Sequence, residues 1–150
     1  MKRRREVGLV LAAVFGVFLW WFLQEDYGVR VASVRWLPPA ATNITYIRND
    51  LNQIAEFDIE QKAFERWCAN RGMPLRRLAD AEQQTLDRCL WILEERGVIP
   101  IDPEPNEAEA YFKELEAGDL FYKERWSNGG GTSIGYDIDE RRGYYESSRH

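Results

Sequence analysis

Residues 120–147 of the chain read LFYKERWSNGGGTSIGYDIDERRGYYES, and this stretch decides the fold that we expect. NGGG at 128–131 and DERRG at 139–143 consist of residues that favour tight turns. The three runs that these turns separate are rich in aromatic and β-branched residues, which is typical of strands. The runs are residues 120–126, 132–138 and 143–147. The stretch therefore predicts three antiparallel strands joined by two turns.

Three further strands are predicted nearer the start of the chain. GVRVASVRWL at 28–37 is rich in β-branched residues and is ended by Pro38 and Pro39. NITYIR at 43–48 and QIAEFDI at 53–59 are short runs with alternating side chains. In the second run the apolar Ala55, Phe57 and Ile59 would share one face, and the acidic Glu56 and Asp58 the other. Because such period-two patterning suits a sheet with a buried face, we expect these runs to be strands as well.

Helical signals occupy the region between the two groups of strands. Three segments there begin with a capping-box pattern, the first of which pairs Asp58 with Gln61, and each segment ends at a glycine. The predicted helices are residues 60–71, 81–96 and 107–117. Strands followed by helices and then by strands indicate an α+β fold, with two to three helices on one face of a largely antiparallel sheet.

The composition fits one domain and excludes several functions. The chain has 150 residues and a mass of 17.6 kDa, with 45% hydrophobic and 30% charged residues. Residues 1–6 carry a net charge of +3, and the other 16 basic and 24 acidic residues give −8. Because binding of nucleic acid needs a basic face, we expect no nucleic-acid partner. His150 is the only histidine, which removes most histidine-based catalysis and metal binding.

The segment VGLVLAAVFGVFLWWFL at 7–23 predicts a membrane anchor. Its 17 apolar residues would form about 26 Å of helix, close to the roughly 30 Å of a bilayer core. We expect a transmembrane helix over residues 7–24, a cytoplasmic start at 1–6 and an extracytoplasmic domain at 28–150. The membrane-interface residues would be the flanking basic and tryptophan side chains, namely Arg3, Arg4, Arg5, Trp20 and Trp21.

Two features of this segment bear on its role. A cleaved signal peptide also has a basic start, but the sequence QEDYG after the run lacks a small-residue cleavage site, so we favour a retained single-pass anchor. Gly8, Ala12 and Gly16 recur every four residues and would form a ridge on one helix face. Such a ridge lets a second transmembrane helix approach closely, although glycine and alanine are also simply common in membrane helices.

Cys68 and Cys89 are the only cysteines, and both lie on predicted helix faces that point inward. Outside the cytoplasm two cysteines commonly pair, and closing such a loop would contribute on the order of 3 kcal/mol. The alternative is two buried free thiols, which are good small core residues. We favour the disulfide, and we expect no catalytic cysteine because no histidine is available to activate a thiol.

Glu56 and Asp58 lie two residues apart on one face of a predicted strand. Paired carboxylates can act as acid and base, and together with Asp50 they could supply calcium ligands. Carboxylates on a half-exposed strand are more often solvated, and no loop has the regular spacing of a calcium site. We therefore expect no catalytic residue, no metal and no cofactor, and a protein that is not an enzyme.

Aromatic residues make up 13% of the chain, and several of them lie on the three C-terminal strands. Because neighbours along a strand point to opposite faces, Tyr144 and Tyr145 cannot both be buried on the same face. We expect Tyr122, Trp126, Tyr144 and Tyr145 to contribute to a partner surface. The alternative is a sheet that is covered on both faces.

Two stretches of the chain follow a pattern that is found elsewhere. The first is LPPAATNITYIRN at 37–49 followed by AEFDIEQKAFERW at 55–67, and the second is GGGTSIGYDIDERRGYYESSRH at 129–150. They resemble uncharacterised bacterial membrane-anchored proteins and lipoproteins. The shared features are strand ends, helix caps and turns, so the resemblance implies an exported bacterial domain and no particular activity.

These observations predict a non-enzymatic single-pass protein of the bacterial inner membrane with a periplasmic or otherwise extracytoplasmic domain. Its expected role is that of an accessory subunit in a larger membrane or envelope complex. Its partners would be membrane lipid and other membrane-protein subunits. The alternative is a membrane-anchored module that binds a small ligand or an envelope polymer, and the sequence does not identify such a ligand.

Overall fold

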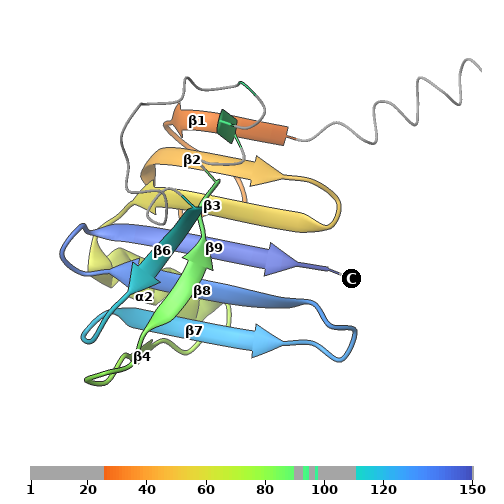
Figure 1. The fold of residues 1–150 in the computed structure, drawn as a ribbon. Helices are drawn as coiled ribbons and strands as arrows, with labels where there is room; N and C mark the ends of the chain where they lie inside the picture. Colours follow the sequence, from red (N-terminus) through yellow and green to blue (C-terminus); the bar gives the residue numbers. More distant parts are fainter. Residues whose placement is uncertain (1–25, 90–92, 95–96, 98–110, 150) are drawn as a thin grey trace, which may run out of the picture.

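Two groups of three strands meet in the centre of one antiparallel sheet (Figure 1). A computed structural model describes residues 26–89, 93–94, 97 and 111–149 of the chain. Its seven-stranded sheet has the order β1-β2-β3-β9-β8-β7-β4. The strands are β1 (Asp26–Val31), β2 (Thr42–Arg48), β3 (Asn52–Asp58), β4 (Arg76–Arg77), β7 (Leu120–Arg125), β8 (Gly131–Asp137) and β9 (Arg142–Ser148). The two groups join where β3 pairs with β9 along its whole length.

All six strands predicted from the sequence are present, although β1 ends at Val31 rather than at residue 37. The two predicted turns connect β7 to β8 and β8 to β9. In the first turn Gly129 has a φ of 90°, and Asn128 Oδ1 accepts a 3.1 Å hydrogen bond from the backbone N–H of Gly130. Glycine adopts this left-handed backbone at no steric cost, so the turn follows directly from the sequence.

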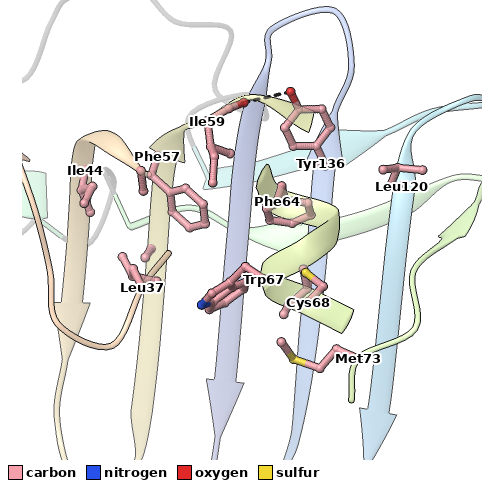
Figure 2. Packing of buried hydrophobic residues seen from close by; sticks show 13 residues of the cluster. Leu37, Ile44, Phe57, Ile59, Phe64, Trp67, Cys68, Met73, Leu120 and Tyr136 are labelled. Carbon is pink, nitrogen blue, oxygen red and sulfur yellow. Dashed lines mark hydrogen bonds between the residues drawn. The ribbon is translucent and has the colours of Figure 1, made fainter. Parts of the chain in front are cut away.

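One face of the sheet is covered by α2 (Gln61–Asn70), which packs on it through an aromatic core (Figure 2). Phe64 and Cys68 point from α2 into this core and are fully buried. Tyr136 of β8 closes the core by donating a 2.9 Å hydrogen bond from its hydroxyl to the backbone carbonyl oxygen of Ile59. The first of the three predicted helices is therefore confirmed.

The start of α2 differs from the prediction. Glu60 is the N-cap residue, and its side chain makes no capping hydrogen bond. Asp58 instead ends β3, and its Oδ1 accepts a 2.7 Å hydrogen bond from Nη1 of Arg142. The predicted capping box is wrong because an ion pair across the sheet engages the carboxylate that was expected to cap the helix.

The opposite face of the sheet is covered by a second, two-stranded antiparallel sheet (Figure 1). It consists of β5 (Gln84–Asp87) and β6 (Phe112–Leu115). Leu86 and Leu115 are buried from this side and lie over Gly135 of β8. A Cβ atom at residue 135 would collide with both leucine side chains, so the glycine permits the close approach of the two sheets.

The predicted α+β fold with two to three helices is wrong in its helical layer. Among the residues that the structure describes, α2 is the only complete helix, and the fold is mostly antiparallel sheet. The segments expected as helices at 81–96 and 107–117 contain β5 and β6. The apolar spacing of Leu86, Cys89 and Leu93 fits a helix, but pairing with β6, far away in sequence, places Leu86 in a strand. Among the described residues of 81–96, only Cys89, Leu93 and Glu94 are helical.

The predicted transmembrane helix over 7–24 lies outside the described residues, which begin at Asp26. No helix within the described part of the chain is long and apolar enough to cross a membrane. The small-residue ridge and the interface residues of the N-terminal segment also fall outside that part. The corrected fold is therefore an antiparallel sheet with one short helix on one face and a small sheet on the other.

Candidate anion-binding site

A buried carboxylate lies at the centre of the sheet face that β5 covers. Glu56 of β3 has a side-chain exposure of 1%. Its Oε2 atom lies 2.9 Å from Nη2 of Arg88 and 3.4 Å from Nη2 of Arg142. Arg142 also places Nη1 2.7 Å from Oδ1 of Asp58. Because an unpaired buried charge is costly, the two arginines are what allows this carboxylate to lie in the interior.

Strand pairing explains why these groups meet. Along β3 the side chains of Glu56 and Asp58 point to the face of β5, whereas that of Phe57 points to the face of α2. β9 follows the same alternation, and its Arg142 pairs directly with Asp58 across the two strands. Arg88 comes immediately after β5, which brings its guanidinium group to Glu56.

Irregular pairing in β1 and β2 adds further polar groups to this cluster. The register of β1 shifts around Arg30, and that of β2 shifts around Asn43. Both residues have left-handed backbone, with φ of 52° and 48°, which is uncommon for residues other than glycine. Asn43 donates a 2.9 Å hydrogen bond from Nδ2 to Asp58 Oδ2, and the N–H of Arg30 donates one of 3.3 Å to Thr45 Oγ1. Bulges re-aim side chains, and strained backbone concentrates at functional sites.

These residues line a pocket of about 300 Å³, which we call the arginine pocket. Its lining residues are Arg30, Asn43, Thr45, Arg88 and Arg142. Three guanidinium groups stand against the two carboxylates of Glu56 and Asp58, so this cluster has a net charge of +1. In a chain whose net charge is −5, the pocket is a local excess of positive charge.

Two side chains of the arginine pocket have donors that no described residue engages. Nε of Arg142 is buried and has no hydrogen-bond partner in the described part of the chain. The Arg30 side chain is exposed and forms no salt bridge with a described residue. Guanidinium groups match the oxygens of carboxylate and phosphate, so the pocket has the chemistry of a site for an oxyanion.

Arg88 is fixed in its charged state by its neighbours. Burial by itself lowers the pKa of Arg88, but the hydrogen bond and the charge of Glu56 outweigh burial and raise the pKa above its ordinary value. A permanently charged group that is held by a buried partner keeps its position before any ligand arrives. Arg88 therefore acts as a rigid part of the pocket wall.

The sequence identifies the carboxylates of this site but not the arginines around them. Glu56 and Asp58 do share one face, as predicted, but Glu56 is buried rather than solvated. A signal was present, because Ile54 precedes Glu56 on the same face and indicates that this face is covered. A covered acid requires basic partners, and the sequence does not show which of its many arginines supply them.

The predicted disulfide between Cys68 and Cys89 is not formed. Both residues are free buried thiols, and they belong to core clusters on opposite faces of the large sheet. Cys89 Sγ lies 3.2 Å from the carbonyl oxygen of Thr45 and 3.4 Å from Oε1 of Glu56. Burial raises the pKa of Cys68 to about 12 and raises that of Cys89 well above its ordinary value. The prediction fails because the large sheet separates the two cysteines, which lie on its opposite faces.

The four aromatic residues expected at a partner surface do not share one face. Tyr144 is only 2% exposed and belongs to the cluster that β5 and β6 cover. Tyr145 points to the face of α2, where its ring centroid lies 5.6 Å from that of Trp36. Tyr122 and Trp126 are half-buried. The sheet is covered on both faces, so the alternative interpretation explains Tyr144 and Tyr145.

Neither a metal site in the described part of the chain nor a similar protein indicates a function. Asp50, the third acid considered for calcium, is exposed between β2 and β3. Within the described ranges, no group of three or more histidine, cysteine or acidic side chains could hold a metal ion. The chain matches no family model, no curated protein and no solved structure.

Proposed function

We propose that the protein is a non-enzymatic binding module that takes an anionic group, a carboxylate or a phosphate, in its arginine pocket. The observation that carries this proposal is the pair of donors that no described residue engages, the side chain of Arg30 and the buried Nε of Arg142. Guanidinium groups that line one pocket suit the oxygens of a carboxylate or phosphate, and the exposed Arg30 can contact such a group without breaking a buried ion pair.

The surroundings of the arginine pocket support selective capture of a small anion. Glu56 holds Arg88 and Arg142 in place, and donors that are fixed beforehand lose less entropy when they bind. Glu56 and Asp58 also leave the cluster only one positive charge in excess. That balance favours a single carboxylate or phosphate group over a polyanion such as nucleic acid.

The N-terminal sequence supports a membrane location and a second role for this module. The basic start and the apolar run at 7–24 would hold the domain at the outer face of a bacterial inner membrane. Gly8, Ala12 and Gly16 would let a membrane helix of another protein approach, which supports a role as an accessory subunit. After extraction in mild detergent, the chain should migrate with the same companion proteins each time. Migration as a lone monomer without crosslinking partners would contradict this role.

Binding of inorganic phosphate tests the arginine pocket. The full-length protein in mild detergent should bind phosphate in an NMR titration, and the affinity should fall as salt is added. Arg30→Ala should weaken binding about ten-fold, because it removes a charge-assisted donor and breaks no buried ion pair. The matched control is Arg35→Ala, which removes an exposed arginine that does not line the pocket and should leave the affinity unchanged. Equal affinities for Arg30→Ala and the wild type would exclude this pocket as the site.

A further inference from the structure

A groove lies beside the contact between the two-stranded sheet and strands β7, β8 and β9 of the large sheet. Its volume is about 280 Å³, just below the roughly 300 Å³ at which the range for small-molecule sites begins. The groove is lined by Asp87 of β5, Phe112 of β6, Lys123 and Arg125 of β7 and Glu146 of β9. It shares no lining residue with the arginine pocket, so the two are separate sites.

Acidic and basic side chains line this groove, and no ion pair joins them to one another or to another described residue. The backbone N–H of Asp87 donates a 3.3 Å hydrogen bond to Glu146 Oε2, which links the end of β5 to β9. In the described part of the chain, neither carboxylate forms a salt bridge with Lys123 or Arg125. Burial is the main reason why the pKa of Asp87 and that of Glu146 are both raised. Because no described cation engages these carboxyl groups, their oxygens stay available to the hydrogen-bonding groups of a ligand.

Phe112 gives the groove an apolar wall. Its side chain is 47% exposed, whereas Phe57, Phe64 and Phe121 are buried in the two cores. Burial of an aromatic ring is among the largest favourable contributions that a side chain makes to binding. A half-exposed ring beside charged side chains that form no salt bridge with a described residue is therefore the combination that small-ligand sites use.

We propose that this groove binds a neutral carbohydrate, with one sugar ring packed on Phe112 and its hydroxyl groups bonded to Asp87 and Glu146. Each sugar hydroxyl both donates and accepts hydrogen bonds, so it suits a surface where acceptors and donors lie side by side. Lys123 and Arg125 supply the donors. A ligand with a net charge is disfavoured, because either sign would meet like charges in the same groove.

Titration with neutral trisaccharides tests this site. The full-length protein, in a detergent without a sugar headgroup, is titrated separately with maltotriose, cellotriose and tri-N-acetylchitotriose and followed by NMR. At least one of them should bind, and its affinity should hardly change between 50 and 500 mM salt. Phe112→Ala should weaken this binding about ten-fold, and Glu146→Gln should weaken it as well. Tyr111→Ala is the matched control, since this 42% exposed neighbouring ring does not line the groove, and it should leave the affinity unchanged.

Three results would overturn the assignment. The first is that none of the trisaccharides binds at concentrations up to 10 mM. The second is that Phe112→Ala binds a trisaccharide as tightly as the wild type does. The third is that glycine or a dipeptide binds in place of the sugars and is displaced by salt, which would make the groove a site for a charged ligand. An unchanged thermal midpoint in Phe112→Ala separates lost binding from lost folding.

Discussion

Replacing Glu56 by alanine should lower the free energy of unfolding by about 3–5 kcal/mol. The substitution removes the carboxylate that Arg88 and Arg142 both contact, at 2.9 and 3.4 Å. The two guanidinium groups, with side-chain exposures of 23% and 18%, would then face each other without the charge between them. Repulsion between the two guanidinium groups and their incomplete hydration would both lower the free energy of unfolding. The expected loss therefore exceeds that of a single hydrogen bond.

Chemical denaturation followed by tryptophan fluorescence measures this effect, provided that the denaturant slope is unchanged. The matched control is Glu82→Ala. Glu82 forms a bidentate pair with Arg76, at 2.7 and 2.8 Å, but both side chains are exposed. An exposed pair is screened by water, so this control should unfold close to the wild type. If Glu56→Ala unfolds at the wild-type denaturant concentration, the charged cluster does not stabilise this face of the sheet.

The long strands of the large sheet could be predicted because local pattern and tertiary structure agree there. The glycines at 129–131 fix the hairpin between β7 and β8. Alternation along β3 places Phe57 in the core with α2 and Glu56 on the other face. Each of these signals lies within a few residues of the structure that it predicts.

β5 and β6 could not be predicted in this way. Each has four residues, and they pair across a long stretch of chain, with Gln84 opposite Leu115. Leu86 falls at helical spacing from Cys89 and Leu93, which are helical in the structure, so the local pattern extends a helix back over β5. What decides between strand and helix is a distant pairing partner and the space above Gly135, and a local window of sequence contains neither.

The residues of the candidate site were likewise predictable from the sequence only where the signal is local. Glu56 and Asp58 share a face because strand alternation is local. Arg88 and Arg142 reach Glu56 from positions 32 and 86 residues away along the chain. Arg30 enters through a shift in strand register, which exists only once β1 and β2 are paired. The sequence therefore identifies the two acidic residues. Only the fold shows which arginines pair with them and which arginine is left to contact a ligand.

Replacing Phe64 by alanine should destabilise the protein by about 3–5 kcal/mol. Phe64 has 0% exposure, and its ring centroid lies 6.2 Å from that of Phe57 and 5.1 Å from that of Tyr136. Alanine would leave a cavity between α2 and the sheet (Figure 2). The three rings hold one another in place, so collapse around the cavity would require several side chains to leave their preferred rotamers.

The same denaturation experiment, with two further variants, separates packing from other causes. Phe112→Ala makes the identical change at a residue that is 47% exposed, and it should alter the free energy of unfolding by less than about 0.5 kcal/mol. Phe64→Leu keeps most of the buried volume and should cost clearly less than Phe64→Ala. Phe64 is one of three buried side chains that attach α2 to the sheet, together with Trp67 and Cys68. Equal losses for Phe64→Leu and Phe64→Ala would mean that the shape of the ring, and not the volume it fills, holds α2 on the sheet.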